Sequence, residues 1–351
     1  MSPELRAAIA ASGGLLPLEE AMALAVARYY ATNEPFGVLG DFVTAPEVSQ
    51  MFGEMLGLWA ADMWLRAGAP NPALLVELGP GRGTLMADAL RAIAQAAPAM
   101  AAAIRLHLVE TSPRLRAQQA LRLPDATWHK TADTLPHDAP MLLLANEFLD
   151  ALPVVQFERL EHGWARRAVT TDASLGHLPA DEDDIAEPLR DFPTGTIFER
   201  RPAAEHLAGR LANRLAKQGG AALFVDYGHA GPLAGDTLQA LAGGAPVEPL
   251  ATLGEADLSA HVDFAALLGA AARAAPVATF GPTPQGAFLA RLGIAHRAET
   301  LKGGKPAKAR AEIEAALSRL TATAMMGRLF KVAAVVAPGW PEPSGFDRKD
   351  A

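Results

Sequence analysis

The sequence predicts an α/β protein built on a Rossmann-like sheet, and three observations predict it. Short apolar runs alternate with helical patterns between residues 73 and 150. The first run ends at a cluster of glycines, at residues 79, 81 and 83, and the second ends at an acid, Glu110. Apolar strands that alternate with helices form parallel sheets covered on both faces.

The expected elements of this core follow one another in a regular order. Strands are predicted over 73–78, 104–109, 126–128 and 141–145, with a helix over 84–94 after the first strand. Ser112 and Pro113 are expected as N-cap and first-turn residue of the next helix. The core then resumes with a helix over 203–217, strands over 221–225, 277–280 and 330–336, and a helix from Asp263.

Four regions are expected along the chain. An N-terminal helical or lid region covers 1–70, and the first half of the core covers 71–150. An insertion on the substrate side covers 151–202, with a hairpin formed by 154–159 and 164–170. The remainder of the core covers 203–351 and carries a Gly/Pro-rich loop at 228–262.

Composition excludes several classes of protein. The chain has 351 residues, of which 39 are Asp or Glu and 31 are Lys or Arg, and this acidic excess argues against a general nucleic-acid binder. It has no cysteine, so disulfides, thiolate metal sites and thiol nucleophiles are excluded. No basic, apolar leader and no uncharged run of membrane-spanning length occur. These features predict a cytoplasmic protein.

The glycine cluster predicts a nucleotide-like cofactor. Gly79, Gly81 and Gly83 lie at a strand-to-helix turn, where the backbone can approach a ligand closely. Their spacing, G-x-G-x-G, differs from the G-x-G-x-x-G of dinucleotide sites. Glu77 before the loop can meet an ammonium, and Glu110 after the next strand can accept from ribose hydroxyls. S-adenosylmethionine has these groups and no pyrophosphate, so it is the predicted cofactor. The alternative is a plain glycine turn with a surface glutamate.

Acids also follow the fourth strand. S-adenosylmethionine donates a methyl group, and groups after this strand can face the atom that accepts it. If that acceptor is a guanidinium, a carboxylate can hold it in a bidentate pair. Glu147 is the first choice for this role and Asp150 the second. The other interpretation, that Glu147 caps a following helix, has equal weight. The loop containing Gly40 and Asp41 is either a lid over the cofactor or a simple turn, and the residues alone favour the turn. No spacing of His and Asp supports a metal site.

These motifs together resemble the MidA family, which includes the mitochondrial respiratory complex I assembly factor 7 proteins. The resemblance spans nearly the whole chain and is carried by residues 36–54, 76–84, 109–112, 145–153, 226–228 and 256–264. It implies a class I methyltransferase fold with an inserted substrate-side region. It also implies methylation of a protein arginine, on a quinone-side subunit of complex I in mitochondrial members. It assigns Gly40, Asp41 and Asn146 to the cofactor side.

Three functions therefore compete. The first is a protein arginine methyltransferase with a role in complex I assembly. The second is a methyltransferase that acts on a small molecule or on another residue. The third is an assembly chaperone that binds S-adenosylmethionine with little turnover. The expected partner is a protein substrate, and the sequence makes no prediction of oligomeric state.

Overall fold

The structure is a computed structural model that describes residues 1–32, 44–185, 187–189 and 191–347. The chain divides into two compact units. One combines Met1–Phe42, Leu149–Leu207 and His229–Leu267, and we call it the insertion unit. The other combines Val43–Phe148, Ala208–Gly228 and Leu268–Ala351, and we call it the sheet unit. The domain limits expected from the sequence stay a prediction.

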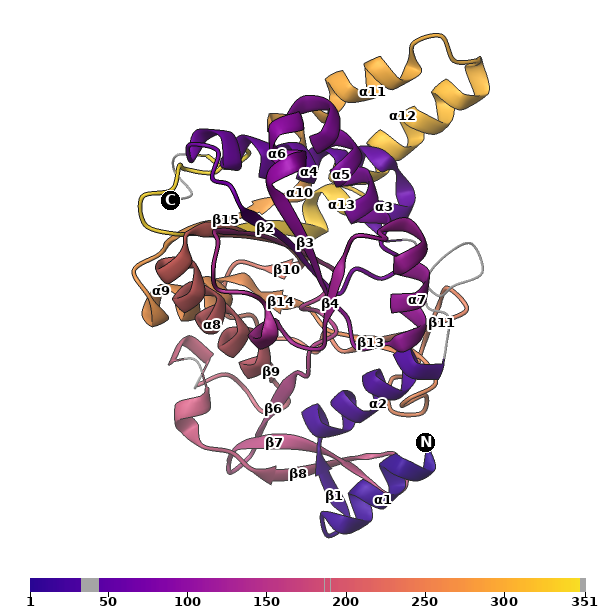
Figure 1. Cartoon of the computed structure of the whole chain (residues 1–351). Helices are drawn as coiled ribbons and strands as arrows, with labels where there is room; N and C mark the ends of the chain where they lie inside the picture. The colour runs from indigo at the N-terminus through magenta and orange to yellow at the C-terminus, as the bar shows by residue number, and fades with distance from the viewer. Residues whose placement is uncertain (33–43, 186, 190, 348–351) are drawn as a thin grey trace. The chain divides into compact units, whose positions relative to one another are not determined.

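A mixed sheet forms the centre of the sheet unit, with the strand order β15-β16-β10-β5-β2-β3-β4 (Figure 1). Strands β10, β5, β2, β3 and β4 run parallel, whereas β16 is antiparallel to both β10 and β15. The predicted α/β class and Rossmann-like core are thus confirmed. The strands are β2 (Ala73–Leu78), β3 (Ile104–Val109), β4 (Thr127–His129), β5 (Met141–Asn146), β10 (Gly220–His229), β15 (Ala278–Pro284) and β16 (Phe330–Val336).

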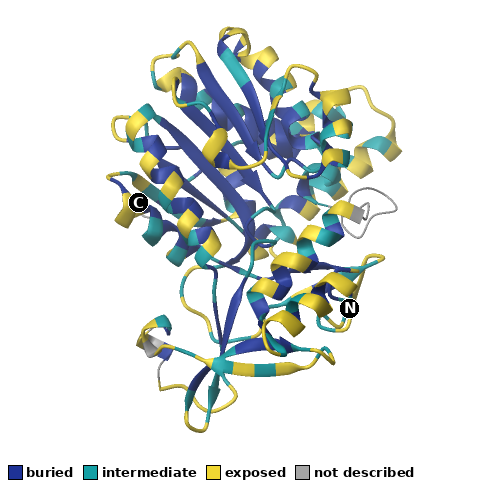
Figure 2. Cartoon of the chain, turned by 60° about the horizontal axis from the view of Figure 1, so that its bottom comes forward, coloured by how far each residue is buried: buried dark blue, intermediate teal, exposed yellow. Residues whose placement is uncertain are grey.

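Helices cover both faces of this sheet. All residues of β2 and β5 are buried, as expected for continuous apolar runs (Figure 2). Figure 1 shows α4, α5 and α6 on one side of the sheet, and α8 and α9 on the other. The helices are α3 (Ala45–Val48), α4 (Gln50–Arg66), α5 (Thr84–Ala96), α6 (Pro98–Ala103), α7 (Pro113–Arg122), α8 (Pro202–Gln218), α9 (Phe264–Ala274), α10 (Gln285–Arg291), α11 (Ile294–Lys302), α12 (Ala307–Thr321) and α13 (Met326–Leu329), with a 3-10 turn at Ala132–Thr134.

Local signals set several of these boundaries. Ser112 caps α7, because its side chain accepts the N–H of Leu115 at 3.4 Å, and Pro113 takes the first turn as predicted. Asp263 caps α9 in the same way through the N–H of Ala266 at 3.0 Å. Both residues therefore define where a helix begins after a strand.

An antiparallel sheet organises the insertion unit, in the order β1-β7-β6-β9, with β8 also paired to β7. The predicted hairpin is confirmed, with Phe157 of β6 opposite Arg166 of β7. One strand, β1 (Leu15–Pro17), lies inside the region expected to be mostly helical, because so short a strand leaves no readable pattern. The elements are α1 (Pro3–Ala11), β1, α2 (Leu18–Thr32), β6 (Val155–Leu160), β7 (Gly163–Thr170), β8 (Leu175–Pro179), β9 (Ile197–Arg200) and β14 (Val262–Asp263), with 3-10 turns at Glu182–Asp184 and Glu187–Leu189.

A small sheet replaces part of the loop expected at 228–262, so that prediction is wrong there. Strands β11 (Gln239–Ala242) and β12 (Ala245–Val247) form a hairpin, and β13 (Asp257–Ser259) pairs with β11. The turn residues Gly243 and Gly244 have φ of 59° and 74°, the left-handed pair that two-residue hairpins require. Alanine-rich strands carry a weak β signal, which hid the hairpin in the sequence.

Candidate functional site

Polar side chains gather at the carboxyl edge of the parallel strands in the sheet unit. Glu77 is the next-to-last residue of β2, Glu110 follows β3, and Asn146 and Glu147 end and follow β5. Strand β10, between β5 and β16, carries Asp226 in its last residues and ends at His229. Ligands of open α/β sheets bind at this edge. These side chains therefore lie where a ligand of this fold is expected to bind.

The loop after β2 requires glycine because of its backbone conformation. Gly79 and Gly81 have φ of 60° and 51°, which side-chain-bearing residues rarely adopt. A Cβ atom added to Gly79 would lie 2.7 Å from Cδ2 of Phe148. The N–H of Gly79 donates to the carbonyl of Val109 at 3.0 Å, and the carbonyl of Gly81 accepts from Gln119 at 2.7 Å. The loop is therefore held from both sides by its neighbours.

Glu110 is fixed by main-chain donors. Its Oε1 accepts the N–H of Ser112 at 2.8 Å, and Gln119 Nε2 lies 3.4 Å from Oε2. Burial raises the pKa of the Glu110 carboxyl, and the N–H groups of Ser112 and Thr111 offset only part of that rise. The Glu110 carboxylate thus has a fixed orientation and a 9 % exposed side chain.

Glu77 lies deeper and is poorly solvated. It is 3 % exposed, and its Oε2 has no hydrogen-bond partner among the described residues. Burial, together with the charge of Glu110, raises the pKa of Glu77 to about 8. At neutral pH the side chain is mainly protonated. A cation placed beside it would favour ionisation.

Glu147 has an unusual backbone. Its φ is 48°, in the left-handed region, and its N–H donates to the carbonyl of Val225 at 2.9 Å. Its Oε1 accepts the N–H of Ala45 at 3.0 Å and the side chain of Asn146 at 3.2 Å. Turns rather than a helix follow it, so the helix-cap interpretation is wrong. The carboxylate is instead tied to the start of α3.

The other predicted site residues lie elsewhere. Asp150 belongs to the insertion unit and is 8 % exposed. Gly40 and Asp41, the predicted lid residues, lie outside the described residues. The predicted Glu77, Gly79, Gly81, Gly83, Glu110, Asn146 and Glu147 all belong to the sheet unit.

Sequence reasoning missed several supporting residues of this edge. Glu47 accepts the hydroxyl of Thr84, the first residue of α5, at 2.7 Å, and its other oxygen lies 3.7 Å from Arg82. Gln119 is oriented by the indole N–H of Trp128, which donates to it at 2.8 Å. These partners are distant in sequence, so no local pattern reveals them.

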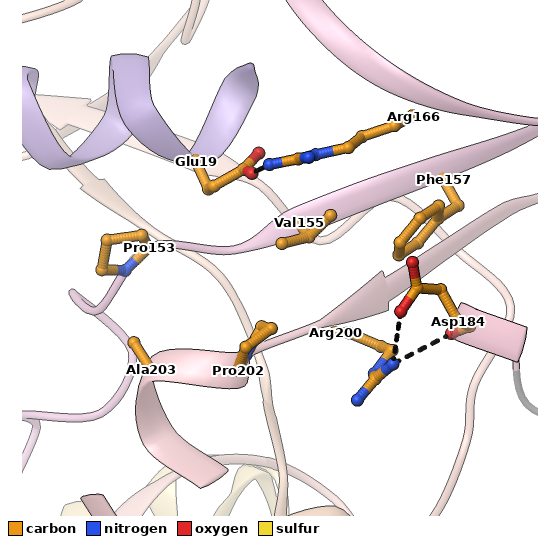
Figure 3. A pocket seen from close by; sticks show the side chains of 9 residues that line it. All are labelled: Glu19, Pro153, Val155, Phe157, Arg166, Asp184, Arg200, Pro202 and Ala203. Atoms are coloured by element: carbon orange, nitrogen blue, oxygen red, sulfur yellow. Dashed lines mark hydrogen bonds and ion pairs between the residues drawn. The ribbon is translucent and has the colours of Figure 1, made fainter. Parts of the chain in front are cut away.

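A separate pocket of about 340 Å³ lies in the insertion unit (Figure 3). Val155 and Phe157 project into it from β6, between two ion pairs. Arg166 pairs with Glu19, while Arg200 pairs with Asp184 at 3.0 Å, and the lining is completed by Pro153, Pro202 and Ala203. Because both arginines are neutralised by acids, the lining gives no preference for an anion.

Comparison with known proteins decides the family. A family of putative S-adenosyl-L-methionine-dependent methyltransferases has a model that matches residues 55–283. The chain belongs to this family. No helix in the described part of the methyltransferase is long and apolar enough to cross a bilayer.

Several curated relatives resemble this methyltransferase along most of its length. It is 33 % identical to "Protein arginine methyltransferase NDUFAF7 homolog, mitochondrial" of Drosophila melanogaster, with 95 % of this chain and 84 % of the relative covered. It is 35 % identical to the NDUFAF7 protein of Danio rerio, with 91 % and 82 % covered. These relatives are named mitochondrial, so our cytoplasmic prediction is wrong. A chain without cysteine is compatible with any redox environment, so its composition could not identify the compartment.

Solved structures agree with the fold and the cofactor. A superfamily member from Burkholderia thailandensis, solved with S-adenosyl-homocysteine bound, superposes with a TM-score of 0.85 at 28 % identity, over 99 % of this chain and 95 % of that one. A second structure from the same organism superposes with a TM-score of 0.81 at 28 % identity, over 98 % and 93 %.

The methyltransferase uses S-adenosylmethionine, as predicted, and the residues of the sheet edge fit that molecule. The orphaned Oε2 of Glu77 suits the ammonium of its amino-acid part. The left-handed φ values of Gly79 and Gly81 give a loop that glycine adopts without strain, which suits close approach of the backbone to a ligand. The fixed carboxylate of Glu110 suits hydroxyl donors.

Proposed function

We propose that this protein transfers a methyl group from S-adenosylmethionine to an arginine of a protein substrate. The observation that carries the proposal is the Glu147 carboxylate, which is held rigidly at the carboxyl edge of the sheet by Ala45 and Asn146. The names of the relatives, which are protein arginine methyltransferases, support a protein acceptor. A fixed carboxylate is the group that binds a guanidinium in two parallel hydrogen bonds.

On the cofactor side we assign a role to each carboxylate and to the glycine loop. Glu77 binds the ammonium, and main-chain groups of Gly79, Gly81 and Gly83 approach the amino-acid part. Glu110 accepts from the ribose hydroxyls. Asn146, with Gly40 and Asp41 on the family's loop, completes the cofactor side in this proposal. S-adenosylmethionine supplies a methyl group on a sulfonium, so these residues need to bind and orient rather than activate it.

On the acceptor side one carboxylate holds the guanidinium in place. A guanidinium stays protonated at neutral pH, and its nitrogens are poor nucleophiles. Glu147 is the first candidate for the carboxylate that localises positive charge on the nitrogens that do not react, and Asp150 is the alternative. That carboxylate also holds the reactive nitrogen in line. Because it acts by alignment, its effect is on the turnover number.

The proposed partner is a quinone-side subunit of respiratory complex I. This part of the proposal is supported by the resemblance to complex I assembly factors and by the mitochondrial names of the relatives.

The test uses Glu147→Gln, which keeps the shape and removes the charge. Purified protein is incubated with S-adenosylmethionine and the quinone-side subunit, and methylarginine is measured by mass spectrometry. We expect kcat to fall by about 100-fold or more while affinity for S-adenosylhomocysteine stays within about twofold. Glu161→Gln, in an exposed turn, is the matched control and keeps full activity.

Two results would contradict the proposal. Normal turnover by Glu147→Gln would remove Glu147 from the acceptor site and leave Asp150 as the candidate, tested by Asp150→Asn. Absence of methylarginine with the wild-type protein, on this subunit and on whole mitochondrial extract, would exclude arginine as the acceptor.

A further inference from the structure

Arg201 is a buried arginine that joins two separate segments of the insertion unit. It lies between β9 and α8 and is 6 % exposed. Its Nη1 donates to the carbonyls of Asp150, at 2.9 Å, and of Leu152. Its Nη2 donates to the carbonyls of Ala260, at 2.8 Å, and of His261, at 3.5 Å. One guanidinium therefore connects the segment after β5 with the segment between β13 and β14.

A second set of hydrogen bonds holds the same peptide from its other side. The N–H of Ala260 donates to the carbonyl of Asp150 at 3.2 Å, so that carbonyl receives two donors. The N–H of His261 donates to the hydroxyl oxygen of Thr237 at 2.9 Å. Thr237 in turn bonds the carboxylate of Glu199, through its N–H at 3.0 Å and through its hydroxyl. These hydrogen bonds together hold the main chain at residue 150 in a fixed position relative to residues 260–261.

Acidic side chains lie on the segments that Arg201 joins. Asp150 is 8 % exposed and Asp257, on β13, is 5 % exposed. The hydroxyl of Tyr30 bonds Asp257, and burial together with the charges of Asp257 and Asp150 holds the pKa of Tyr30 well above its usual range. A shift of the Asp150 main chain would therefore change the position of its carboxylate beside a second acid.

We infer that Arg201 is a positioning residue of the acceptor side. It fixes the main chain of Asp150 against Ala260 and His261, so that the Asp150 carboxylate keeps one place when the guanidinium of a protein substrate binds. The inference rests on the proposed role of Asp150. Arginine suits the task because its planar fork reaches several carbonyls at once, whereas the ammonium of lysine acts as a single point.

A matched control exists in the sheet unit. Arg214 on α8 is 9 % exposed and donates to the carbonyls of Ala132, at 3.0 Å, Leu135, at 3.1 Å, and Pro136, at 2.6 Å. It performs the same chemistry on a segment that carries no proposed acceptor residue. Arg201→Met and Arg214→Met should both lower thermal stability. A difference in turnover between them therefore reports loss of positioning and not loss of folding.

The experiment is a double-mutant cycle with the full-length protein and the quinone-side subunit at saturating S-adenosylmethionine. Arg201→Met should lower kcat by about tenfold or more, and Arg214→Met by no more than about twofold. Added to Asp150→Asn, Arg201→Met should cause no further loss, because it acts through Asp150. Arg201→Lys should recover part of the rate. Multiplied losses in the double variant, or equal losses in the two Met variants, would overturn the inference.

Amide hydrogen exchange provides a readout that needs no substrate. Exchange at residues 257–261 should be faster in Arg201→Met than in the wild type, and unchanged there in Arg214→Met. If the wild type makes no methylarginine, the proposed function fails, and unchanged exchange in Arg201→Met would then refute the positioning role by itself.

Discussion

Two glutamates of the sheet unit are equally shielded from solvent, but their pKa values shift in opposite directions. Glu54 on α4 and Glu77 on β2 are each 3 % exposed. Glu54 accepts from Arg297 at 2.8 Å through both oxygens, and also from Gln50 and Arg91. Burial alone would raise its pKa, but these partners lower the pKa below its ordinary value. Within the described part of the chain Glu77 has no such partner, and its pKa rises to about 8.

The difference shows that the cations around a buried carboxyl decide the direction of its pKa shift. Glu54 joins α4, α5 and α11 with cations supplied by the chain itself. Glu77 is left for a cation that arrives from outside, and in our proposal that cation is the cofactor ammonium. Each of the following predictions tests whether the sheet edge depends on a ligand in a way that the helix layer does not.

The largest expected effect comes from the loop beside Glu77. Gly81→Val places a branched side chain at a φ of 51°, where the backbone is strained and the ligand needs the space. Affinity for S-adenosylhomocysteine, measured by calorimetry, should fall by about 100-fold or more. Gly68→Val is the matched control, because Gly68 has a φ of 88° with open space around it. It should lose stability and keep affinity.

The second prediction compares the same substitution at the two glutamates. Glu54→Gln should lower the free energy of unfolding by about 1–3 kcal/mol, since it leaves arginines without their carboxylate, and should leave cofactor affinity unchanged. Glu77→Gln should lose about 1.5–3 kcal/mol in binding. It should not lower stability at neutral pH, because glutamine, unlike Glu77, needs no proton to be buried. Urea denaturation and calorimetry on both variants measure the two quantities. If Glu77→Gln is the less stable of the two and binds normally, Glu77 is a structural residue.

The smallest expected effect is the release of a proton when the cofactor binds. The folded pKa of Glu77 is raised from 4.5 to about 8, so its contribution to stability is full below pH 4.5 and is lost as the pH rises toward 8. Pairing with an ammonium lowers that pKa again, so binding at pH 7 should release roughly one proton and affinity should increase toward pH 8. Calorimetry in two buffers of different ionisation enthalpy counts the proton. Glu77→Gln should abolish most of the release, and a wild type that releases none would contradict the assigned role.

The sequence predicted those parts of the molecule whose evidence is local. Glu77, the glycines and Glu110 were predictable because strand, loop and helix follow one another and fix their positions at the sheet edge. The contact between Ala45 and Glu147 joins residues far apart in the chain, as does that between Arg297 and Glu54, and no spacing reveals either. The hairpin at Gly243 and Gly244 was missed because its strands have little β-branched character.

The left-handed backbone of Glu147 has a consequence for laboratory evolution. A side-chain-bearing residue in that conformation costs about 1–3 kcal/mol, and glycine, or to a lesser degree asparagine, relieves the cost. A library selected only for heat resistance should therefore enrich Gly or Asn at position 147. If Glu147 orients the acceptor as proposed, these heat-stable variants no longer methylate. The position that such a selection abandons first would mark where the fold retains strain for the sake of its chemistry.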